Sequence, residues 1–456
     1  MYLSPDGTKL YYASRYEGGY DLWVHDLEKN TTKILCKGFG RGDWIPDAKG
    51  NNLYICNGTL CKLDLASGTR KDLPFKAETE GQTATQRAFI YDHCVHQILN
   101  RFCDPDYHGV DFKSYAAHYR EFLPSIGNSR DLSEMVSELL GELNCSHTGL
   151  KYQPRRNLKQ TANLAAFYDA AYQGDGLKIS EIVKGGSLDL PDHQVKEGDI
   201  IRQIDHQQIE AGKDYYPLLA GKAGKWVLLT VTDAKGKHSR DIYVKPVSQS
   251  GLSELLYKRW VDRNAAFVKD YSKGEVGYVH IEDMDSKSFR RVYSEMLGKY
   301  RNCKSIVVDE RHNGGGWLHD DLAVLLSGKQ FQTYTSRGQY LGPDPYSRWY
   351  RPNCVLVCED CYSNANGFPS MYKALGLGKL VGAPMAGTMT AVWWEREIDP
   401  ELVEGLPEVN CLDMKGRPCE NQQLDPDIEV QLTPADQLSG HDTQLQRAVE
   451  LMMGKE

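Results

Sequence analysis

Long hydrophobic runs and abundant cysteine are both missing from this sequence, and their absence excludes several classes of protein. No stretch of about 18 consecutive apolar residues occurs, so we expect no membrane-spanning helix. The first residues, MYLSPDGTKLYY, lack the basic start and apolar core of a secretory signal peptide. The 12 cysteines among 456 residues are too few for a disulfide scaffold. The compartment stays open: cytoplasm, or periplasm if a leader was removed from a longer precursor.

An excess of basic residues is missing too. Lys and Arg number 54 against 62 Asp and Glu, which gives a formal net charge of −8. A dedicated nucleic-acid binder needs a concentrated basic face, so we expect no nucleic-acid partner. With 41% hydrophobic and 25% charged residues, the chain has an ordinary globular composition. Its length suggests about three domains.

Residues 1–78 consist of short alternating runs separated by turn signals such as Asp-Gly and Ser-Gly. The pattern repeats: SPDG at residue 4 corresponds to IPDA at residue 45, and DLWVHDLEKN at residue 21 to TLCKLDLASG at residue 59. A period of about 40 residues with four strands each is typical of propeller blades. We therefore predict two propeller-like blades, which are too few to close a ring.

Two further segments follow before the C-terminal half. Residues 79–160 have apolar residues at helical spacing and predict a small helical domain that carries Ser146-His147 near its end. Residues 161–250 predict a small β domain, in which the run VKEGDIIRQID resembles PDZ domains. Such domains bind extended peptides by adding a strand to a sheet edge. A β domain without a binding role is the alternative.

Residues 251–456 alternate strand and helix patterns and predict an α/β domain with a mostly parallel sheet. SIVVDER, CVLVCED and KLVGAP are apolar runs of the buried-strand type. Reactive groups in such folds lie at the carboxyl ends of strands. The expected fold is therefore multidomain α+β, with propeller-like blade repeats, a helical domain, a PDZ-like domain and an α/β catalytic domain of βαβ units.

Two candidate sites follow buried strands in the α/β region. The loop Asn313-Gly-Gly-Gly316 could turn backbone N–H groups toward an oxyanion or a phosphate, or could be a simple turn. Neither G-x-x-x-x-G-K-[ST] nor G-x-G-x-x-G is present, which disfavours nucleotide binding. Ser363 lies on a strand-to-helix turn, where the amide of Asn364 could donate to an oxyanion. A helix N-cap is the simpler role for such a serine.

A nucleophilic serine also needs a base and a group that orients it. His147 is a candidate base because an imidazole titrates near neutral pH, but composition cannot select one histidine among 13. Glu420 could orient that base. It could equally be a solvated loop charge.

The order of these motifs resembles the tricorn family of serine peptidases, relatives of the C-terminal processing proteases. The resemblance covers essentially the whole chain and corresponds to the C-terminal half of a full-length tricorn protein. It implies a serine endopeptidase or oligopeptidase that works through an acyl-enzyme on peptides or unfolded proteins, without cofactor or metal. Relatives form hexamers, so a homo-oligomer is expected. The implied catalytic tetrad is Ser146, His147, Ser363 and Glu420, with oxyanion amides from Asn364 and from Gly315 or a glycine one position away.

Two departures from related patterns bear on this assignment. Tricorn proteins typically have aspartate after the nucleophile, where this chain has Asn364; only its backbone amide is implied in catalysis. Processing proteases with a Ser–Lys dyad carry lysine in a G-x-x-x-x-G-K run. Here Gly382 to Gly387 is followed by Thr388, so the histidine-based tetrad is favoured.

Two alternatives come from other functional classes. One is a non-catalytic peptide-binding scaffold of propeller and PDZ parts. The other is a zinc-stabilised protein, because Cys358-Glu-Asp-Cys361 has the spacing of half a zinc site and Cys354 is nearby. The remaining candidate pair, Cys411 and Cys419, is poorly spaced, so we expect buried thiols rather than a metal site.

Overall fold

The computed structural model describes residues 1–16, 18–40, 43–56, 59–74, 76, 81, 83–154 and 160–455. The chain divides into two compact units, Met1–Gly81 and Gln82–Glu456. None of the helices in these described ranges has both the length and the apolar character needed to cross a membrane.

The first unit contains two four-stranded antiparallel sheets, each built from consecutive strands. The first sheet comprises β1 (Tyr2–Leu3), β2 (Lys9–Ser14), β3 (Asp21–Asp26) and β4 (Thr31–Cys36). The second comprises β5 (Asp43–Pro46), β6 (Asn52–Cys56), β7 (Leu60–Asp64) and β8 (Arg70–Asp72). Leu22, Leu53 and Leu63 belong to one buried cluster. The described strands form two four-stranded sheets and no closed ring, and the propeller-like character predicted for these blades is not confirmed.

The second unit begins with helices whose buried side chains form one core. They are α1 (Ala84–Arg101), α2 (Phe112–Arg120) and α3 (Ser129–Gly141), with 3-10 turns η1 (Tyr107–Gly109) and η2 (Leu123–Ser125). Asn128 begins α3 as its N-cap, because its side chain accepts the N–H of Asp131. The side chains of Leu139 and Leu140 on this helix are buried in that core.

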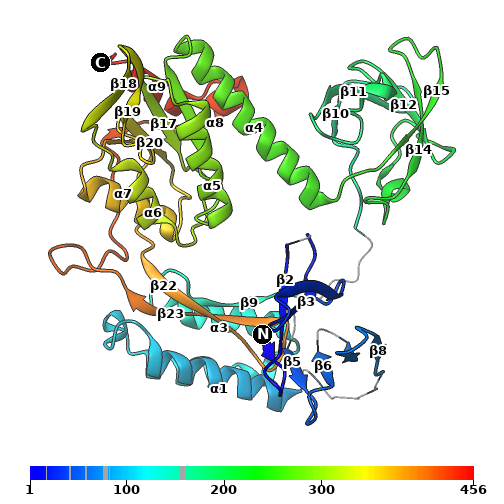
Figure 1. Ribbon diagram of the computed structural model, residues 1–456, viewed down its shortest axis with the longest axis vertical. Coiled ribbons are helices and arrows are strands. Elements are labelled where there is room, and N and C mark those ends of the chain that lie inside the picture. The colour runs from blue at the N-terminus through cyan, green and yellow to red at the C-terminus, as the bar shows by residue number, and fades with distance from the viewer. Residues whose placement is uncertain are drawn as a thin grey trace. The chain divides into compact units, whose positions relative to one another are not determined.

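A hairpin from the C-terminal part of the sequence completes that helical core. It comprises β22 (Thr390–Arg396) and β23 (Leu402–Asn410), and β23 pairs with β9 (Gly149–Tyr152) in an antiparallel three-stranded sheet. Leu402 and Leu406 pack in the same cluster as the helix side chains. Figure 1 shows the hairpin beside α1 and α3. This pairing brings residues near 147 to a strand that follows the candidate nucleophile in the sequence.

The residues that follow the helices and precede the α/β region along the chain form a separate antiparallel sheet. Its strand order is β10-β11-β12-β14-β15, with β13 on β12. The strands are β10 (Ala166–Tyr168), β11 (Leu177–Ile182), β12 (Ile200–Ile204), β13 (Gln207–Gln208), β14 (Val227–Thr232) and β15 (Arg240–Val244), with 3-10 turns η3 (Pro191–His193) and η4 (Tyr216–Leu219). Its core is formed by aliphatic side chains such as Ile201, Leu229 and Val244.

The α/β region is built on a parallel five-stranded sheet. Its order is β16 (Val276–His280), β17 (Ser305–Asp309), β20 (Asn353–Val357), β21 (Lys379–Gly382) and β24 (Ile428–Glu429). The apolar strand runs are buried on both faces, as expected when helices cover both sides of a parallel sheet. Remaining elements are a π-helical turn η5 (Glu295–Lys299), the hairpin β18 (Gln332–Ser336) with β19 (Gln339–Asp344), and α8 (Pro434–Ser439).

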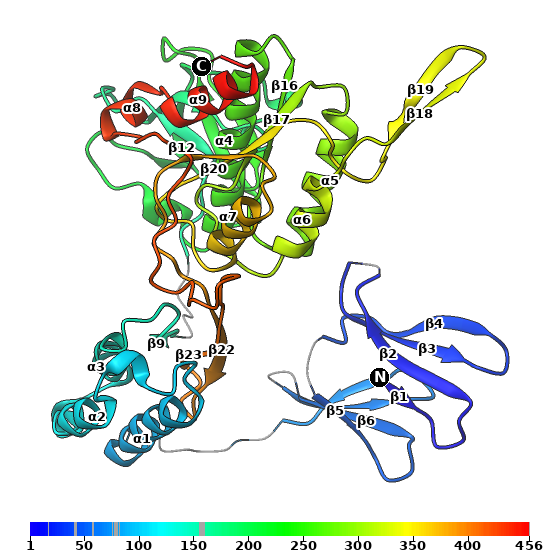
Figure 2. The same cartoon turned by 90° about the vertical axis from the view of Figure 1, so that its left-hand side faces the viewer.

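Two helix layers enclose this sheet (Figures 1 and 2). Val308 and Val355 face the layer of α5 (Ser286–Ser294), α6 (His319–Leu326) and α7 (Asn364–Ala374). Val307 and Leu356 face the layer of α4 (Gln249–Tyr271) and α9 (Thr443–Met452). All five strands run the same way, so the loops after β17, β20 and β21 gather at one edge. The glycine loop, Ser363 and Thr388 lie on these loops.

Candidate active site

Ser363 lies between β20 and α7 in a rarely populated backbone conformation. Its φ is 59° and its ψ is −124°, a combination that costs energy for a non-glycine residue and is often retained at functional sites. Ser363 occupies the N-cap position, but its hydroxyl caps none of the described amides of α7. Its backbone N–H donates to Thr388 Oγ1 at 2.9 Å. The serine therefore does not serve the simpler structural role of a helix cap.

His147 is buried, with 8% of its surface exposed. Its Nδ1 lies 2.7 Å from Ser146 Oγ and 3.1 Å from Thr390 Oγ1. Its backbone N–H donates to the Tyr362 hydroxyl at 2.7 Å, and the two rings lie 4.8 Å apart. Nε2 is buried and has no hydrogen-bond partner among the described residues. The imidazole therefore packs against Tyr362, the residue before Ser363, and its Nε2 forms no hydrogen bond with a described residue.

Glu420 is only 4% exposed, so it is not a solvated loop charge. Its Oε1 accepts the backbone N–H of Ser146 at 2.6 Å, and its Oε2 accepts the Ser146 hydroxyl at 3.0 Å. An ionised carboxylate only accepts, so Ser146 Oγ donates to Glu420 and can accept from His147 Nδ1–H. This relay leaves the lone pair on Nε2, the nitrogen that a general base would use.

Three consecutive residues before and within β22 connect the separate parts of the site. Thr388 Oγ1 accepts the Ser363 N–H, the Met389 N–H donates to Glu420 Oε2 at 2.6 Å, and Thr390 Oγ1 contacts His147. The structure thus gathers all four residues of the predicted tetrad around one short segment. Sequence reasoning missed Tyr362, Met389 and Thr390 as parts of this arrangement. The two threonines that follow Gly387, Thr388 and Thr390, were the sequence feature that could have indicated this segment.

The glycine loop packs directly against the Ser363 turn. Gly315 has φ 99°, and a Cβ at this position would lie 2.6 Å from Ser363 Cβ and 3.1 Å from the Asn364 nitrogen. Its N–H donates to Asn313 Oδ1 at 2.8 Å, and the Asn313 carbonyl accepts the Tyr362 N–H at 3.1 Å. Only glycine fits so close to the serine without displacing it.

The side chain of Asn364 has a role that the sequence did not indicate. Its Oδ1 accepts the N–H groups of Leu318 at 2.8 Å and His319 at 3.1 Å, at the start of α6. Its Nδ2 lies 2.7 Å from His319 Nδ1. Asn364 therefore links α6 to α7 just beyond the glycine loop.

Electrostatics favour the neutral form of the buried imidazole. Burial lowers the pKa of His147, because the imidazolium loses its hydration. Glu420 partly offsets this effect by raising the pKa, and the cation of Lys151 lowers it further. A neutral imidazole at physiological pH is the form that can accept a proton.

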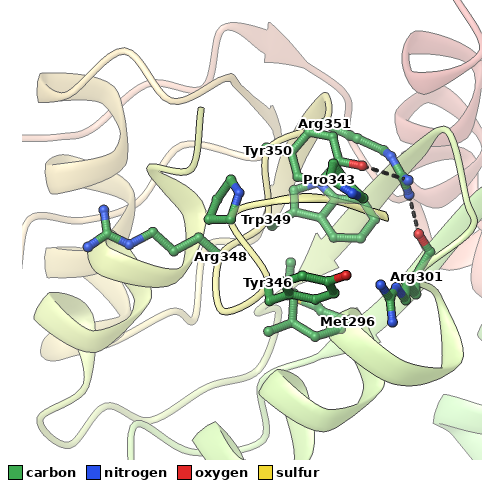
Figure 3. Close-up of a pocket in the computed structure, with 10 residues that line it drawn as sticks. Met296, Arg301, Pro343, Tyr346, Arg348, Trp349, Tyr350 and Arg351 are labelled. Carbon is green, nitrogen blue, oxygen red and sulfur yellow. Dashed lines mark hydrogen bonds between the residues drawn. The ribbon is translucent and has the colours of Figure 1, made fainter. Parts of the chain in front are cut away.

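A pocket elsewhere in the α/β region lies between η5 and the residues after β19 (Figure 3). It has a volume of about 50 Å³, which leaves room for a few water molecules. The Arg351 guanidinium bonds to the Tyr350 hydroxyl at 2.8 Å and to the Arg301 carbonyl. None of the candidate tetrad residues lines this pocket.

Comparison with known families matches three segments of the chain. The Tricorn protease C1 domain matches residues 83–141, the Tricorn protease PDZ domain matches residues 164–249, and Peptidase family S41 matches residues 275–430. The prediction of a mixed α/β multidomain protein with a PDZ domain is thus confirmed, and the α/β region is a family S41 peptidase domain.

Similar proteins agree with these matches. The Tricorn protease of Thermoplasma acidophilum is 28% identical over 351 residues, which cover 74% of this chain and 32% of that protein. Tricorn protease homolog 1 of Streptomyces coelicolor is 28% identical over 375 residues, which cover 80% and 35%. The crystal structure of the tricorn protease superposes with a TM-score of 0.83 at 21% identity, covering 98% of this chain and 45% of that one. The chain spans about a third of the length of these curated relatives.

Proposed function

We propose that this chain, which belongs to the tricorn family of serine peptidases, hydrolyses peptide bonds in peptides or unfolded proteins with Ser363 as nucleophile. One observation carries the proposal. Glu420, Ser146 and His147 form a buried hydrogen-bonded relay that ends in an uncommitted Nε2. The relay packs against the residue preceding a strained serine.

In the first step, Ser363 Oγ attacks the carbonyl carbon of the substrate and forms a C–O bond. His147 Nε2 takes the hydroxyl proton, while Nδ1–H stays bonded to Ser146 Oγ. The negative charge of Glu420, transmitted through Ser146, stabilises the imidazolium. Nε2 is not bonded to Ser363 Oγ here. We expect that bond to form with substrate bound, because catalytic hydrogen bonds are often long in empty sites.

The developing oxyanion would be held by two backbone amides. The Asn364 N–H stands at the start of α7, where the helix dipole favours negative charge. Gly315 or a neighbouring glycine would supply the second N–H. The Gly315 amide would then exchange Asn313 Oδ1 for the oxyanion. Each such donor contributes about 10²–10³-fold to kcat.

Collapse of the tetrahedral intermediate breaks the C–N bond, and His147 passes its proton to the leaving amine. A water molecule then attacks the acyl-enzyme ester, with the same imidazole as base, and releases the acid product and Ser363. The sequence match to a PDZ domain supports peptide substrates, since PDZ domains bind extended chains at a sheet edge. Assembly into a homo-oligomer is part of the same proposal.

The alternative is a non-catalytic peptide-binding scaffold, and serine reactivity separates the two. We expect wild-type protein to cleave fluorogenic peptides and to be labelled by a fluorophosphonate, and Ser363→Ala to lose both. Ser370→Ala is the matched control, because Ser370 lies on the same helix and its hydroxyl bonds to the Asn366 carbonyl. Equal cleavage by Ser363→Ala and wild type would reject the assignment of the nucleophile. Absence of labelling and cleavage in wild type would favour the scaffold.

A further inference from the structure

Three potential metal ligands lie together next to the Ser363 turn, and a second cysteine lies beside one of them. Donor atoms of His312, Cys358 and Asp360 all lie within 4.8 Å of one another. His312 Nδ1 is 2.9 Å from Asp360 Oδ2 and 4.0 Å from Cys358 Sγ, which is 2.7 Å from Asp360 Oδ1. Cys361 Sγ lies 3.8 Å from Cys358 Sγ. This spacing fits zinc, because two thiolates at about 2.3 Å from a tetrahedral ion are about 3.8 Å apart.

One backbone N–H group points at each of the two sulfur atoms. The His312 N–H points at Cys358 Sγ at 3.2 Å, and the Cys358 N–H points at Cys361 Sγ at 3.5 Å. Nearby, Glu310 is fully buried, and neither of its carboxyl oxygens has a partner in the described part of the chain. His312 and Asp360 already pair at 2.9 Å, and a bound zinc ion would replace this contact by taking both side chains as ligands.

We propose that His312, Cys358 and Asp360 bind a zinc ion, and that Cys361, whose sulfur adjoins that of Cys358, moves in as the fourth ligand. Sulfur, imidazole and carboxylate are the ligands that zinc takes in tetrahedral sites. The Cys-x-x-Cys spacing was visible in the sequence, but the completing pair is not Cys411 and Cys419. The missing ligand is a histidine 46 positions earlier, in the loop that follows the neighbouring strand β17.

The proposed ion joins the two loops that carry the candidate catalytic groups. His312 directly precedes Asn313 of the glycine loop, and Cys361 directly precedes Tyr362 and Ser363. Zinc would therefore fix the glycine loop against the serine turn. It would act as a positioning element, outside the chemistry of peptide cleavage.

The ion would reach its ligands from solvent. The His312 and Asp360 side chains are each 58% exposed, while both cysteines are buried. His312 also lines an open cleft of about 550 Å³ together with Trp260 and His280. The site thus has buried thiolates on the protein side and exchangeable ligands on the solvent side, so chelators can remove the metal.

Metal content of the purified full chain tests the proposal. After loading with Zn²⁺ and desalting under reducing conditions, we expect about one zinc per chain. His312→Gln and Cys358→Ser should lose most of it. Cys354→Ser is the matched control: this buried thiol lies on the opposite face of the sheet, 3.8 Å from the Ala448 carbonyl, and its loss should leave zinc unchanged. Because His312 is exposed, its variant should fold even if a cysteine variant does not.

Absorption spectra of the protein loaded with Co²⁺ in place of Zn²⁺ test which cysteines bind the metal. We expect a thiolate-to-cobalt absorption band in wild type that weakens in Cys361→Ser and disappears in the double variant of Cys358 and Cys361. A wild type without bound zinc, a His312→Gln variant with full zinc, or a Cys358–Cys361 disulfide found by thiol counting in protein purified without reductant would overturn the proposal. Ser363→Ala should bind zinc normally, so zinc binding is tested independently of the proposed peptidase activity.

Discussion

Thr388 Oγ1 accepts the backbone N–H of Ser363 at 2.9 Å. Thr388 follows Gly387, the place in the sequence where Ser–Lys processing proteases carry their lysine. The residue that replaces the lysine thus contacts the main chain of the proposed nucleophile, and His147 is the proposed base. Thr388 helps to hold Ser363 in its strained conformation.

Thr388→Val should therefore lower activity without unfolding the protein. One neutral hydrogen bond contributes about 0.5–1.5 kcal/mol, so we expect a roughly 2- to 12-fold fall in kcat/KM. Steady-state cleavage of a fluorogenic peptide measures it. Thr230→Val removes a hydroxyl bonded to Asp241 on another sheet and should keep full activity. Equal rates for both variants would show that the Thr388 contact is dispensable.

Gly315→Ala should abolish cleavage. The new methyl group would overlap Ser363 Cβ at 2.6 Å and would also be strained by the positive φ of this position. Gly314→Ala is the control, because a Cβ there meets no atom within 4 Å. Peptide cleavage and thermal unfolding should be compared for the two variants. An active Gly315→Ala protein would mean that the loop does not support the serine turn in the working enzyme.

The pH dependence of kcat/KM should report the buried imidazole. The base works when deprotonated, so activity rises with pH through the pKa of His147, and burial places that pKa below its ordinary value of 6.5. Lys151→Gln removes a cation that lowers this pKa, so the acid limb should move to higher pH. In Lys245→Gln, which removes a lysine stacked on Trp226 in another sheet, the limb should stay in place. A shift to lower pH in Lys151→Gln would contradict the assignment.

Ser146→Ala and Glu420→Gln should be strongly non-additive. Both residues act through His147 Nδ1, so the double variant should be hardly slower than the slower single variant. The expected losses lie mainly in kcat, since neither side chain is proposed to touch substrate. A double-mutant cycle on kcat gives the coupling. Independent, multiplicative losses would argue that the relay does not operate as a unit.

Glu404 provides a prediction about stability rather than activity. Its side chain is fully buried, and burial together with the nearby Glu397 carboxylate raises its pKa to about 9. The folded state keeps the proton that the unfolded state releases above pH 4.5, so stability falls as pH rises from about 4.5 to 9. Glu404→Gln should remove this dependence and stabilise the protein by roughly 3 kcal/mol at pH 7.

Denaturant unfolding at several pH values tests this effect. The gain should shrink toward pH 4, where the wild-type carboxyl is protonated in both states. Glu197→Gln, at an exposed position, should change stability little. A Glu404→Gln protein that is less stable than wild type at pH 8 would indicate that the carboxylate is ionised and partnered in solution.

The sequence revealed the strands of the α/β region because their apolar runs are buried on both faces. It could not reveal the sheet register, and the register explains what was missed. Asp309 pairs with Leu356, so the residues after β17 lie beside those after β20. Because these two loops are neighbours, the His312 N–H points at Cys358 Sγ, although no local sequence pattern connects the two residues.

The candidate tetrad was likewise visible only in part. The resemblance to the tricorn family implied Ser146, His147, Ser363 and Glu420 as the tetrad, but the contacts of Thr390 depend on a long-range strand pairing. The hairpin β22–β23 buries Leu402 and Leu406 in a core whose other members lie more than 250 positions earlier. Hydrophobic periodicity describes one element at a time, so it does not indicate which core an amphipathic hairpin will join.

Ser146 and Glu420 are separated by 274 positions, and their contact has a consequence for biosynthesis. A ribosome adding 5–20 residues per second needs about 14–55 s to progress from one to the other. Ser146 and His147 are made first, then Ser363, and until Glu420 follows the nascent chain has no carboxylate to orient the imidazole. The proposed peptidase would thus remain inert until Glu420 itself has been synthesised and has reached Ser146.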